Sequence, residues 1–256
     1  MSNWDPDLYL KFKKERTQAV KDLIFRIRKE KPERILDLGC GPGNSTVELK
    51  NRWQESDITG LDNSAAMLDK AKKDYQEFNW VLADANKELT FLGKFDIVFS
   101  NAVIQWIPGH KKLLNNLFDI LNPGGVLAVQ TPNTSLMPIR IAIVKTASEL
   151  RWQKYFEEMD GKVNYRELDY YYDILSPMAN EVELWETSYN HIISNHRDII
   201  EWYSSTGMRP YLERLDEKQQ EEFKESVLTK IKKDYKTQQN GFVLFPFRRL
   251  FFIAYK

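Results

Sequence analysis

A glycine-rich loop with acidic residues on either side is the part of this sequence best suited to bind a ligand. Asp37 is followed by Gly39, Gly41 and Gly43 at alternate positions, and glycines so placed let the backbone approach a ligand closely. Asp62 follows near the roughly 20-residue offset at which an acid meets ribose hydroxyls in nucleotide-binding sheets. The spacing therefore predicts a ligand that contains a nucleoside.

The residues of the loop also narrow the kind of nucleoside. A dinucleotide fingerprint requires a small residue where this chain has Asn44, and no Gly-Lys-Ser/Thr of a phosphate-binding loop follows. A carboxylate at Asp37 suits a cation or an ammonium group better than a phosphate. The alternatives are structural: the glycines make a tight turn, Asp62 caps a helix, and Asp84 lies in a solvated turn.

Alternating strands and helices must position these residues. Apolar runs predict strands at 34–38, 57–61, 80–82, 95–99 and 126–130, with helices at 45–53, where Ser45 is the expected cap, 64–73 and 111–121. Strands that alternate with helices imply a parallel sheet covered on both faces. Ligands bind beyond the carboxyl ends of such strands, which is where Asp37, Asp62 and Asp84 fall.

The alternation stops after residue 131. We predict a helical insertion at 137–158, strands at 182–193 and 242–255, and helices at 197–206 and 216–235. The expected fold is α/β, a mostly parallel seven-stranded sheet with helices on both faces and a helical lid. We expect one domain over 1–256, with the core at about 15–131, 180–195 and 241–256 and the lid at about 132–179 and 196–240.

Composition excludes several classes of protein. The 256 residues are 42% hydrophobic and 29% charged, with 37 basic and 37 acidic residues, which argues against disorder and against general nucleic-acid binding. A single cysteine, Cys40, cannot form an intramolecular disulfide, and with three histidines it offers no plausible zinc ligand set. No apolar run approaches the roughly 18 residues that cross a bilayer. We therefore expect a cytoplasmic protein without metal, membrane or obligate protein partner.

Residues 37–46, with Asp62, Asp84 and the Asn122-Pro123-Gly124-Gly125 turn, resemble the motifs of class I S-adenosylmethionine-dependent methyltransferases. The resemblance covers residues 35–130 and implies a Rossmann-like fold, S-adenosyl-L-methionine as cofactor and S-adenosyl-L-homocysteine as product. It also implies that the glycines hold the methionine part, Asp62 the ribose and Asp84 the adenine. The implied cofactor-binding residues are Trp4, Tyr9, Asp37, Gly39, Gly41, Gly43, Asn44, Asp62, Asn63, Met67, Asp84, Ala85, Asn101, Gln105 and Trp106.

A narrower likeness extends over nearly the whole chain. Trp4-Asp5-Pro6, Gln105-Trp106, residues 171–175 and residues 206–210 resemble the branch of this family that esterifies small polycarboxylates such as trans-aconitate. Residues 245–249 depart from that pattern in being more basic. The implied substrate-binding residues are Arg140, Tyr171, Tyr172, His191, Arg209 and Arg249, with Arg166 a further candidate.

The implied reaction needs no enzyme base, because a carboxylate with a reference pKa near 4 is already ionised at pH 7. We therefore expect no catalytic acid or base, and name Gln105 and Trp106 as positioning candidates. Each residue has a plainer alternative: Gln105 and Trp106 pack a strand edge, Arg140 and Arg166 are solvated, and His191 is a core residue. The alternative functions are methylation of another acid or a phenol, with a base such as His191, and a non-catalytic cofactor-binding module.

Overall fold

The computed structural model describes residues 13–157 and 163–256, so Trp4 and Tyr9 lie outside the described residues. The chain divides into two compact units. The first, called here the sheet unit, comprises Met1–Pro132, Arg166–Glu186 and Arg249–Lys256. The second, the helical unit, comprises Asn133–Tyr165 and Thr187–Arg248.

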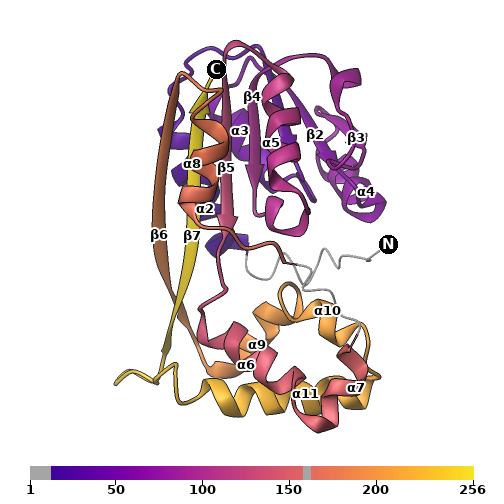
Figure 1. Cartoon of the computed structure of the whole chain (residues 1–256), viewed down its shortest axis with the longest axis vertical. Coiled ribbons are helices and arrows are strands. Elements are labelled where there is room, and N and C mark those ends of the chain that lie inside the picture. The colour runs from indigo at the N-terminus through magenta and orange to yellow at the C-terminus, as the bar shows by residue number, and fades with distance from the viewer. Residues whose placement is uncertain (1–12, 158–162) are drawn as a thin grey trace. The chain divides into compact units, whose positions relative to one another are not determined.

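Seven strands of the described residues form one sheet (Figure 1), as the sequence predicted. The five strands β1 to β5 are parallel where they pair, and β7 runs antiparallel to β5. Strands β6 and β7 each belong partly to both units. In sheet order the strands are β3 (Asn79–Leu82), β2 (Asp57–Asp62), β1 (Arg34–Leu38), β4 (Phe95–Asn101), β5 (Leu121–Pro132), β7 (Val243–Tyr255) and β6 (Glu181–Ile193).

Helices cover both faces of the sheet unit, with α5 and α8 in front of the sheet and α2 and α3 behind it in Figure 1. Arg52, at the end of α3, donates hydrogen bonds to the carbonyl oxygens of Ile24 and Ile27 and so ties α3 to the last turn of α2. The helices of this unit are α2 (Lys13–Arg26), α3 (Asn44–Arg52), α4 (Ala65–Asp74), α5 (His110–Asp119) and α8 (Leu168–Leu175), with short 3₁₀ turns η1 (Thr90–Leu92) and η2 (Ile104–Trp106).

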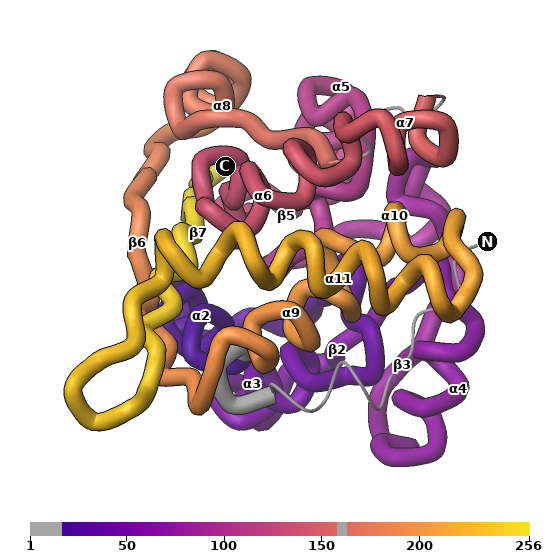
Figure 2. The backbone as a smooth tube through the Cα atoms, turned by 90° about the horizontal axis from the view of Figure 1, so that it is seen from below, coloured from indigo at the N-terminus to yellow at the C-terminus, as the bar shows by residue number. Residues whose placement is uncertain are grey.

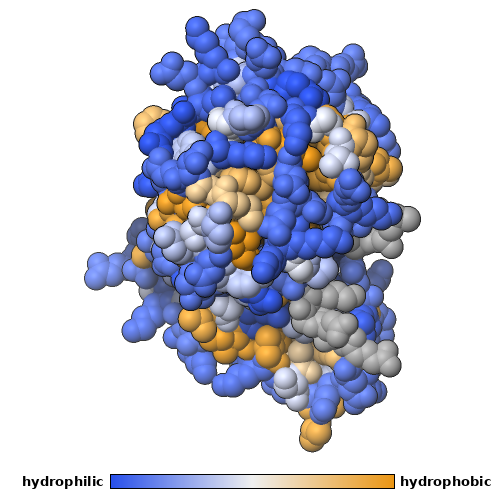
Figure 3. Space-filling view, turned by 45° about the horizontal axis from the view of Figure 1, so that its top comes forward, coloured by the Kyte–Doolittle hydropathy of each residue, from blue (hydrophilic) through white to orange (hydrophobic). Residues whose placement is uncertain are grey.

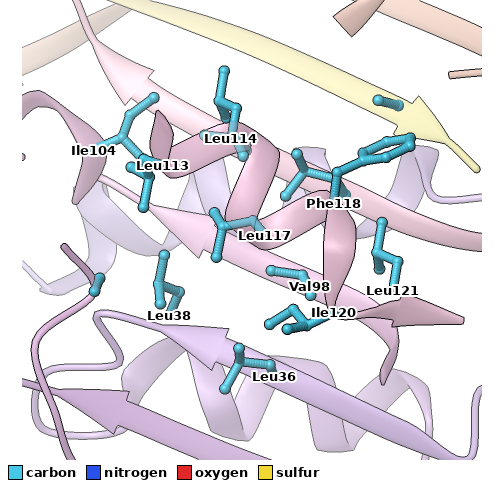
Figure 4. Close-up of a cluster of buried hydrophobic side chains, with 14 of the residues drawn as sticks. Leu36, Leu38, Val98, Ile104, Leu113, Leu114, Leu117, Phe118, Ile120 and Leu121 are labelled. Carbon is cyan, nitrogen blue, oxygen red and sulfur yellow. The ribbon is translucent and has the colours of Figure 1, made fainter. Parts of the chain in front are cut away.

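The front face of the sheet unit holds a continuous apolar core. Successive side chains of a strand point to opposite faces, so Leu36 and Leu38 of β1 lie in this core while Asp37 points to the other face, where it meets α3. Leu113 and Leu117, one helical turn apart on α5, pack over these leucines (Figure 4). The strand therefore buries its leucines on one side and presents a carboxylate on the other.

The helical unit is built around α11, which packs against α6 and α9 (Figure 2). Its buried residues Phe223, Val227 and Ile231 recur every four positions and form one apolar stripe. Asp216 and Gln219 close a capping box at its start, which fixes where the helix begins. The helices of this unit are α6 (Pro138–Ala147), α7 (Leu150–Phe156), α9 (His196–Ser204), α10 (Arg209–Leu212) and α11 (Glu217–Ile231).

Three local predictions need correction. The single helix predicted at 137–158 is two helices, because Glu149 has an extended backbone (φ −69°, ψ 143°) between α6 and α7. Ser45 does not cap α3: Gly43 is the N-cap residue, and the Ser45 hydroxyl lies inside the helix, bonded to Asp37. The sequence analysis did not predict α8, and residues 166–179, expected in the lid, belong to the sheet unit.

Hydrophilic side chains dominate the face of the molecule seen in Figure 3, with apolar side chains showing between them. Among the described residues, no helix combines the length and the apolar character that a membrane span requires.

Candidate active site

Asp37 occupies the end of β1 as a fully buried carboxylate. Its Oδ2 accepts hydrogen bonds from the hydroxyls of Ser45 and Thr46, both at 2.7 Å, whereas its Oδ1 is buried without a hydrogen-bond partner in the described part of the chain. Burial raises the pKa of Asp37 to about 6, against the two hydroxyl hydrogen bonds, and the charge of Asp62 adds to the rise. Burying this charged carboxylate is unfavourable, and its Oδ1 remains able to accept a hydrogen bond from another donor.

The glycine loop follows directly and depends on left-handed backbone. Gly39, Gly41 and Gly43 have φ of 69°, 55° and 91°, a region that L-residues rarely adopt. A Cβ on Gly39 would lie 2.2 Å from a methyl group of Val103, so close packing also requires glycine there. A Cβ on Gly41 would meet no atom within 4 Å, which leaves the backbone at Gly41 open to a ligand.

Asp62 closes the other side of this loop. Its Oδ2 accepts a hydrogen bond from the backbone N–H of Gly41 at 2.9 Å, and its Oδ1 accepts one from the N–H of Ser64 at 2.9 Å. Burial raises the pKa of Asp62, although the hydrogen bonds from Ser64, Gly41 and Asn63 oppose the rise. The side chain of Asn63 is exposed, whereas that of Met67, in the first turn of α4, is buried. Asp62 and the glycine loop are therefore in direct contact, whereas a contact of Asp62 with ribose stays a prediction.

Asp84 follows β3 in a local turn. Its Oδ1 accepts hydrogen bonds from the backbone N–H of Asn86 at 2.9 Å and from the Asn86 side chain at 3.0 Å. Asp84 is half-buried and Ala85 is buried in the core. Asp84 therefore lies in a turn, as the structural alternative expected, directly after β3, the neighbour of β2. A contact between Asp84 and adenine stays a prediction.

The segment after β4 is strained. Ala102 is the one non-glycine residue with positive φ, 58°, among the residues described. Gln105 holds this segment by donating from Nε2 to the carbonyl oxygen of Ala102 at 2.7 Å, and its Oε1 accepts from the hydroxyl of Thr131 at 3.2 Å. Gln105 is buried and Trp106 half-buried. Strain of this kind persists where surrounding structure enforces it and is typical of functional sites.

These residues fit a ligand that carries both a nucleoside and a positive charge. The unpartnered Oδ1 of Asp37 is an acceptor for a cation. A Cβ on Gly41 would meet nothing within 4 Å, and the Gly41 N–H contacts the carboxylate of Asp62. Asn44, the first residue of α3, is half-buried beside this loop. A phosphate would meet two carboxylates here, so the arrangement favours a cationic cofactor over a nucleotide phosphate.

Arg140 lies in the helical unit, on α6. Its Nη1 donates a hydrogen bond to the hydroxyl of Tyr211 at 3.2 Å, and its guanidinium lies 5.7 Å from the centre of that ring. It has no acidic partner among the described residues. The hydroxyls of Thr134 and Tyr165, hydrogen-bonded to each other, belong to the same unit. The sequence analysis did not single out Tyr165 or Tyr211.

Two other candidates of the helical unit have different surroundings. Arg209 forms an ion pair with Glu213, with Nε and Oε1 3.0 Å apart. Burial lowers the pKa of Arg209, although the Glu213 charge opposes this. His191 is buried among aromatic rings, with ring centres 4.9 Å from Trp202 and 6.2 Å from Phe247. The structure therefore agrees with the core alternative for His191.

Tyr171 does not lie where the sequence analysis expected a substrate residue. It is fully buried in the sheet unit, stacked on Phe252, and its hydroxyl is 3.1 Å from Nδ1 of His110. Tyr172 is half-exposed on the same helix, and the exposed Arg166 lies 5.2 Å from the ring centre of Tyr170. We therefore withdraw Tyr171 from the substrate-binding set.

Arg249 lies in the sheet unit together with a residue that the sequence analysis missed. It is buried on β7, and its Nη1 donates a hydrogen bond to Oε1 of Gln130 at 3.1 Å. Gln130 follows the apolar residues 126–129 of β5, and a polar amide directly after an apolar strand is the signal that could have identified it.

Known proteins resemble this chain in sequence and in fold. A family model described as "Methyltransferase domain" matches residues 12–177. Trans-aconitate 2-methyltransferase of Escherichia coli K12 is 39% identical over 254 residues, which cover 99% of this chain and 98% of that one. Among solved structures, the YcgJ protein of Bacillus subtilis aligns with a TM-score of 0.60 at 14% identity, covering 94% of this chain and 98% of that one.

A second solved structure is Haemonchus contortus phosphoethanolamine N-methyltransferase 2 in complex with S-adenosyl-L-methionine. It aligns with a TM-score of 0.55 at 17% identity, covering 93% of this chain and 52% of that one. Structural similarity at this identity supports the fold, whereas the family model and the Escherichia coli relative establish the family. The chain belongs to the S-adenosylmethionine-dependent methyltransferases.

Proposed function

We propose that this chain transfers a methyl group to a carboxylate of trans-aconitate or a similar small polycarboxylate, giving a monomethyl ester. The name of the Escherichia coli relative supports this substrate class. The observation that carries the proposal is Arg140, a half-buried arginine without an acidic partner among the described residues. A guanidinium matches a carboxylate through two parallel hydrogen bonds.

The residues of the sheet unit hold the cofactor in this proposal. S-adenosyl-L-methionine supplies, when bound, a methyl group on a positively charged sulfur. Asp37 accepts a hydrogen bond from the ammonium group through its unpartnered Oδ1, and the Gly41 backbone lies against the methionine part. Asp62 has a lone pair that remains for a ribose hydroxyl, because three backbone N–H groups share the roughly four lone-pair sites of its two oxygens. Asp84 is assigned to the adenine.

The substrate needs no base from the enzyme. Its carboxylate is ionised at neutral pH, and the rate comes from holding the carboxylate oxygen in line with the methyl group, where proximity is worth roughly 7–11 kcal/mol. Exclusion of water strengthens the attraction between anion and cation. We assign the binding of the remaining carboxylates to Arg140, with Arg209 and Arg249 as further candidates. A lid role for the helical unit stays a prediction.

Mass spectrometry tests the proposal directly. Trans-aconitate incubated with the protein and S-adenosyl-L-methionine should gain one methyl group, and the product should hydrolyse in mild base as an ester does. The rate should vary little with pH near neutrality, because no enzyme group has to lose a proton. If trans-aconitate is not methylated but a phenol is, at a rate that rises through neutrality and disappears in His191→Asn, the alternative function of phenol methylation is supported instead.

A further inference from the structure

Four polar residues project from one face of the sheet unit, three of them near the carboxyl ends of β1, β4 and β5 and the fourth beside them on the antiparallel strand β7. Asp37 pairs with Phe99, and Asn101, two residues later on β4, lies opposite Gln130 of β5. On the other side of β5, Gln130 lies opposite Phe251, two residues from Arg249. Positions two apart on a strand share a face, so Asp37, Asn101, Gln130 and Arg249 lie on the same side of the sheet, the side covered by α3.

The amide of Gln130 has a defined orientation. The Arg249 guanidinium carries only donors, so the atom 3.1 Å from its Nη1 must be the amide oxygen, Oε1. The nitrogen Nε2 is therefore turned away from Arg249. It is buried and has no hydrogen-bond partner in the part of the chain that the structure describes, and the whole residue is 0% exposed. A buried donor without an acceptor is destabilising, which indicates that an acceptor arrives with a ligand.

The chemistry beside Gln130 defines that ligand. An N–H donor next to a guanidinium suits a carboxylate. Strand β5 is separated from β1 by β4, and strands lie about 4.8 Å apart, so Gln130 starts about 10 Å from the strand that carries Asp37. The ammonium and carboxylate of the cofactor share one carbon atom, so with the ammonium at Asp37 the cofactor carboxylate stays near β1. The carboxylate at Gln130 therefore belongs to the second molecule, the substrate.

We infer that Gln130, oriented by Arg249, binds a carboxylate of the substrate through Nε2 and so makes the enzyme select polycarboxylates. The inference rests on the proposed function. Gln130 is a specificity residue in this account: it contacts a carboxylate that is not the one methylated, and it takes no part in the methyl transfer.

Gln130→Glu tests this inference while keeping an oxygen for Arg249. The variant replaces the donor by a negative charge, so calorimetry in the presence of S-adenosyl-L-homocysteine should show trans-aconitate binding about 10- to 100-fold more weakly than wild type, the effect of one lost hydrogen bond to a charged group. Affinity for S-adenosyl-L-homocysteine alone should stay within about twofold. Gln130→Met, similar in length and uncharged, is the second variant, for use if Gln130→Glu does not fold. It should weaken trans-aconitate binding by a similar factor.

Asn115 on α5 supplies the matched control, since its Oδ1 is also buried without a partner among the described residues but lies outside the site. Asn115→Asp should leave trans-aconitate affinity unchanged. Substrate analogues with each carboxylate in turn replaced by a methyl group give a sharper readout: one analogue should bind wild type and Gln130→Met equally well, because it has no acceptor for Gln130 Nε2.

The possible failures are distinguishable. Unchanged trans-aconitate affinity in both Gln130 variants overturns the inference, as does an equal loss of S-adenosyl-L-homocysteine affinity, which would place Gln130 at the cofactor. If wild type neither binds nor methylates any polycarboxylate, the proposed function itself is wrong.

Discussion

Replacing Asp37 by asparagine should stabilise the cofactor-free protein and abolish cofactor binding. The carboxylate is buried, and burial raises its pKa from 3.8 to about 6. One pKa unit corresponds to 1.36 kcal/mol, so the ionised carboxylate is disfavoured in the folded state by about 3 kcal/mol. Asparagine keeps an oxygen for the hydroxyls of Ser45 and Thr46 and carries no charge. We expect the free energy of unfolding at pH 7.5 to rise by as much as about 3 kcal/mol.

The pH dependence gives the sign of this effect. Because the folded-state pKa of Asp37 is raised, the stability gained by its protonation is fully present below about pH 3.8 and is lost as the pH rises through about 6. The stability difference between Asp37→Asn and wild type should therefore be large at pH 7.5 and should shrink as the pH falls below about 6. Urea unfolding followed by circular dichroism at pH 7.5 and pH 5 measures both values.

Asp96 provides the opposite control in the same unit. Burial raises its pKa, but hydrogen bonds from Asn122 and from the backbone N–H groups of Arg34 and Glu33 outweigh this and lower the pKa overall. Asp96→Asn should therefore lower stability at neutral pH.

Calorimetry should detect no S-adenosyl-L-homocysteine binding by Asp37→Asn. A destabilised Asp37→Asn protein that still binds this ligand normally would refute the reasoning.

Three further variants test individual placements. Arg140→Gln should raise KM for trans-aconitate about 10- to 100-fold, as expected for lost hydrogen bonds to a charged group, with unchanged calorimetric affinity for S-adenosyl-L-homocysteine; a loss of both would make Arg140 structural. Tyr171→Phe should cost about 1 kcal/mol of unfolding free energy through the lost His110 hydrogen bond and leave steady-state KM unchanged, whereas a higher KM would restore the substrate role. Ala102→Gly should leave the free energy of unfolding in urea unchanged or slightly higher, because glycine adopts the observed φ of 58° without strain. The control Ala254→Gly, in β7, should lower the free energy of unfolding by about 1 kcal/mol. Similar losses at both positions would show that Ala102 is not strained.

Three buried polar atoms of the sheet unit have the same energetic effect on the protein. Asp37 Oδ1, Asn101 Oδ1 and Gln130 Nε2 are all buried without partners among the described residues. They lie at the carboxyl ends of adjacent strands and on the same face. Unpaired polar groups cost free energy in the ligand-free protein, and binding of ligands with matching donors and acceptors recovers it. The polar atoms of the proposed site therefore lower the stability of the ligand-free protein.

The sequence alone determined the sheet and the glycine loop, because both depend on local patterns. Short apolar runs mark β1, β2 and β4, and alternating glycines after Asp37 mark a turn, whose backbone is left-handed at all three glycines. The contact between Gly41 and Asp62 follows from strand order, since β1 and β2 are neighbours in a parallel sheet. Patterns that extend over only a few residues can be read from the sequence without knowledge of the fold.

Only the tertiary structure decided what the isolated polar residues do. Tyr171 and Gln130 each carry a polar group on a side chain that the fold buries completely. Packing gives the hydroxyl of Tyr171 a partner in His110 and leaves Nε2 of Gln130 without one among the described residues. The difference arises because a hydrogen bond depends on which residue, distant in sequence, the fold brings within about 3 Å, and no local pattern of the chain contains that information.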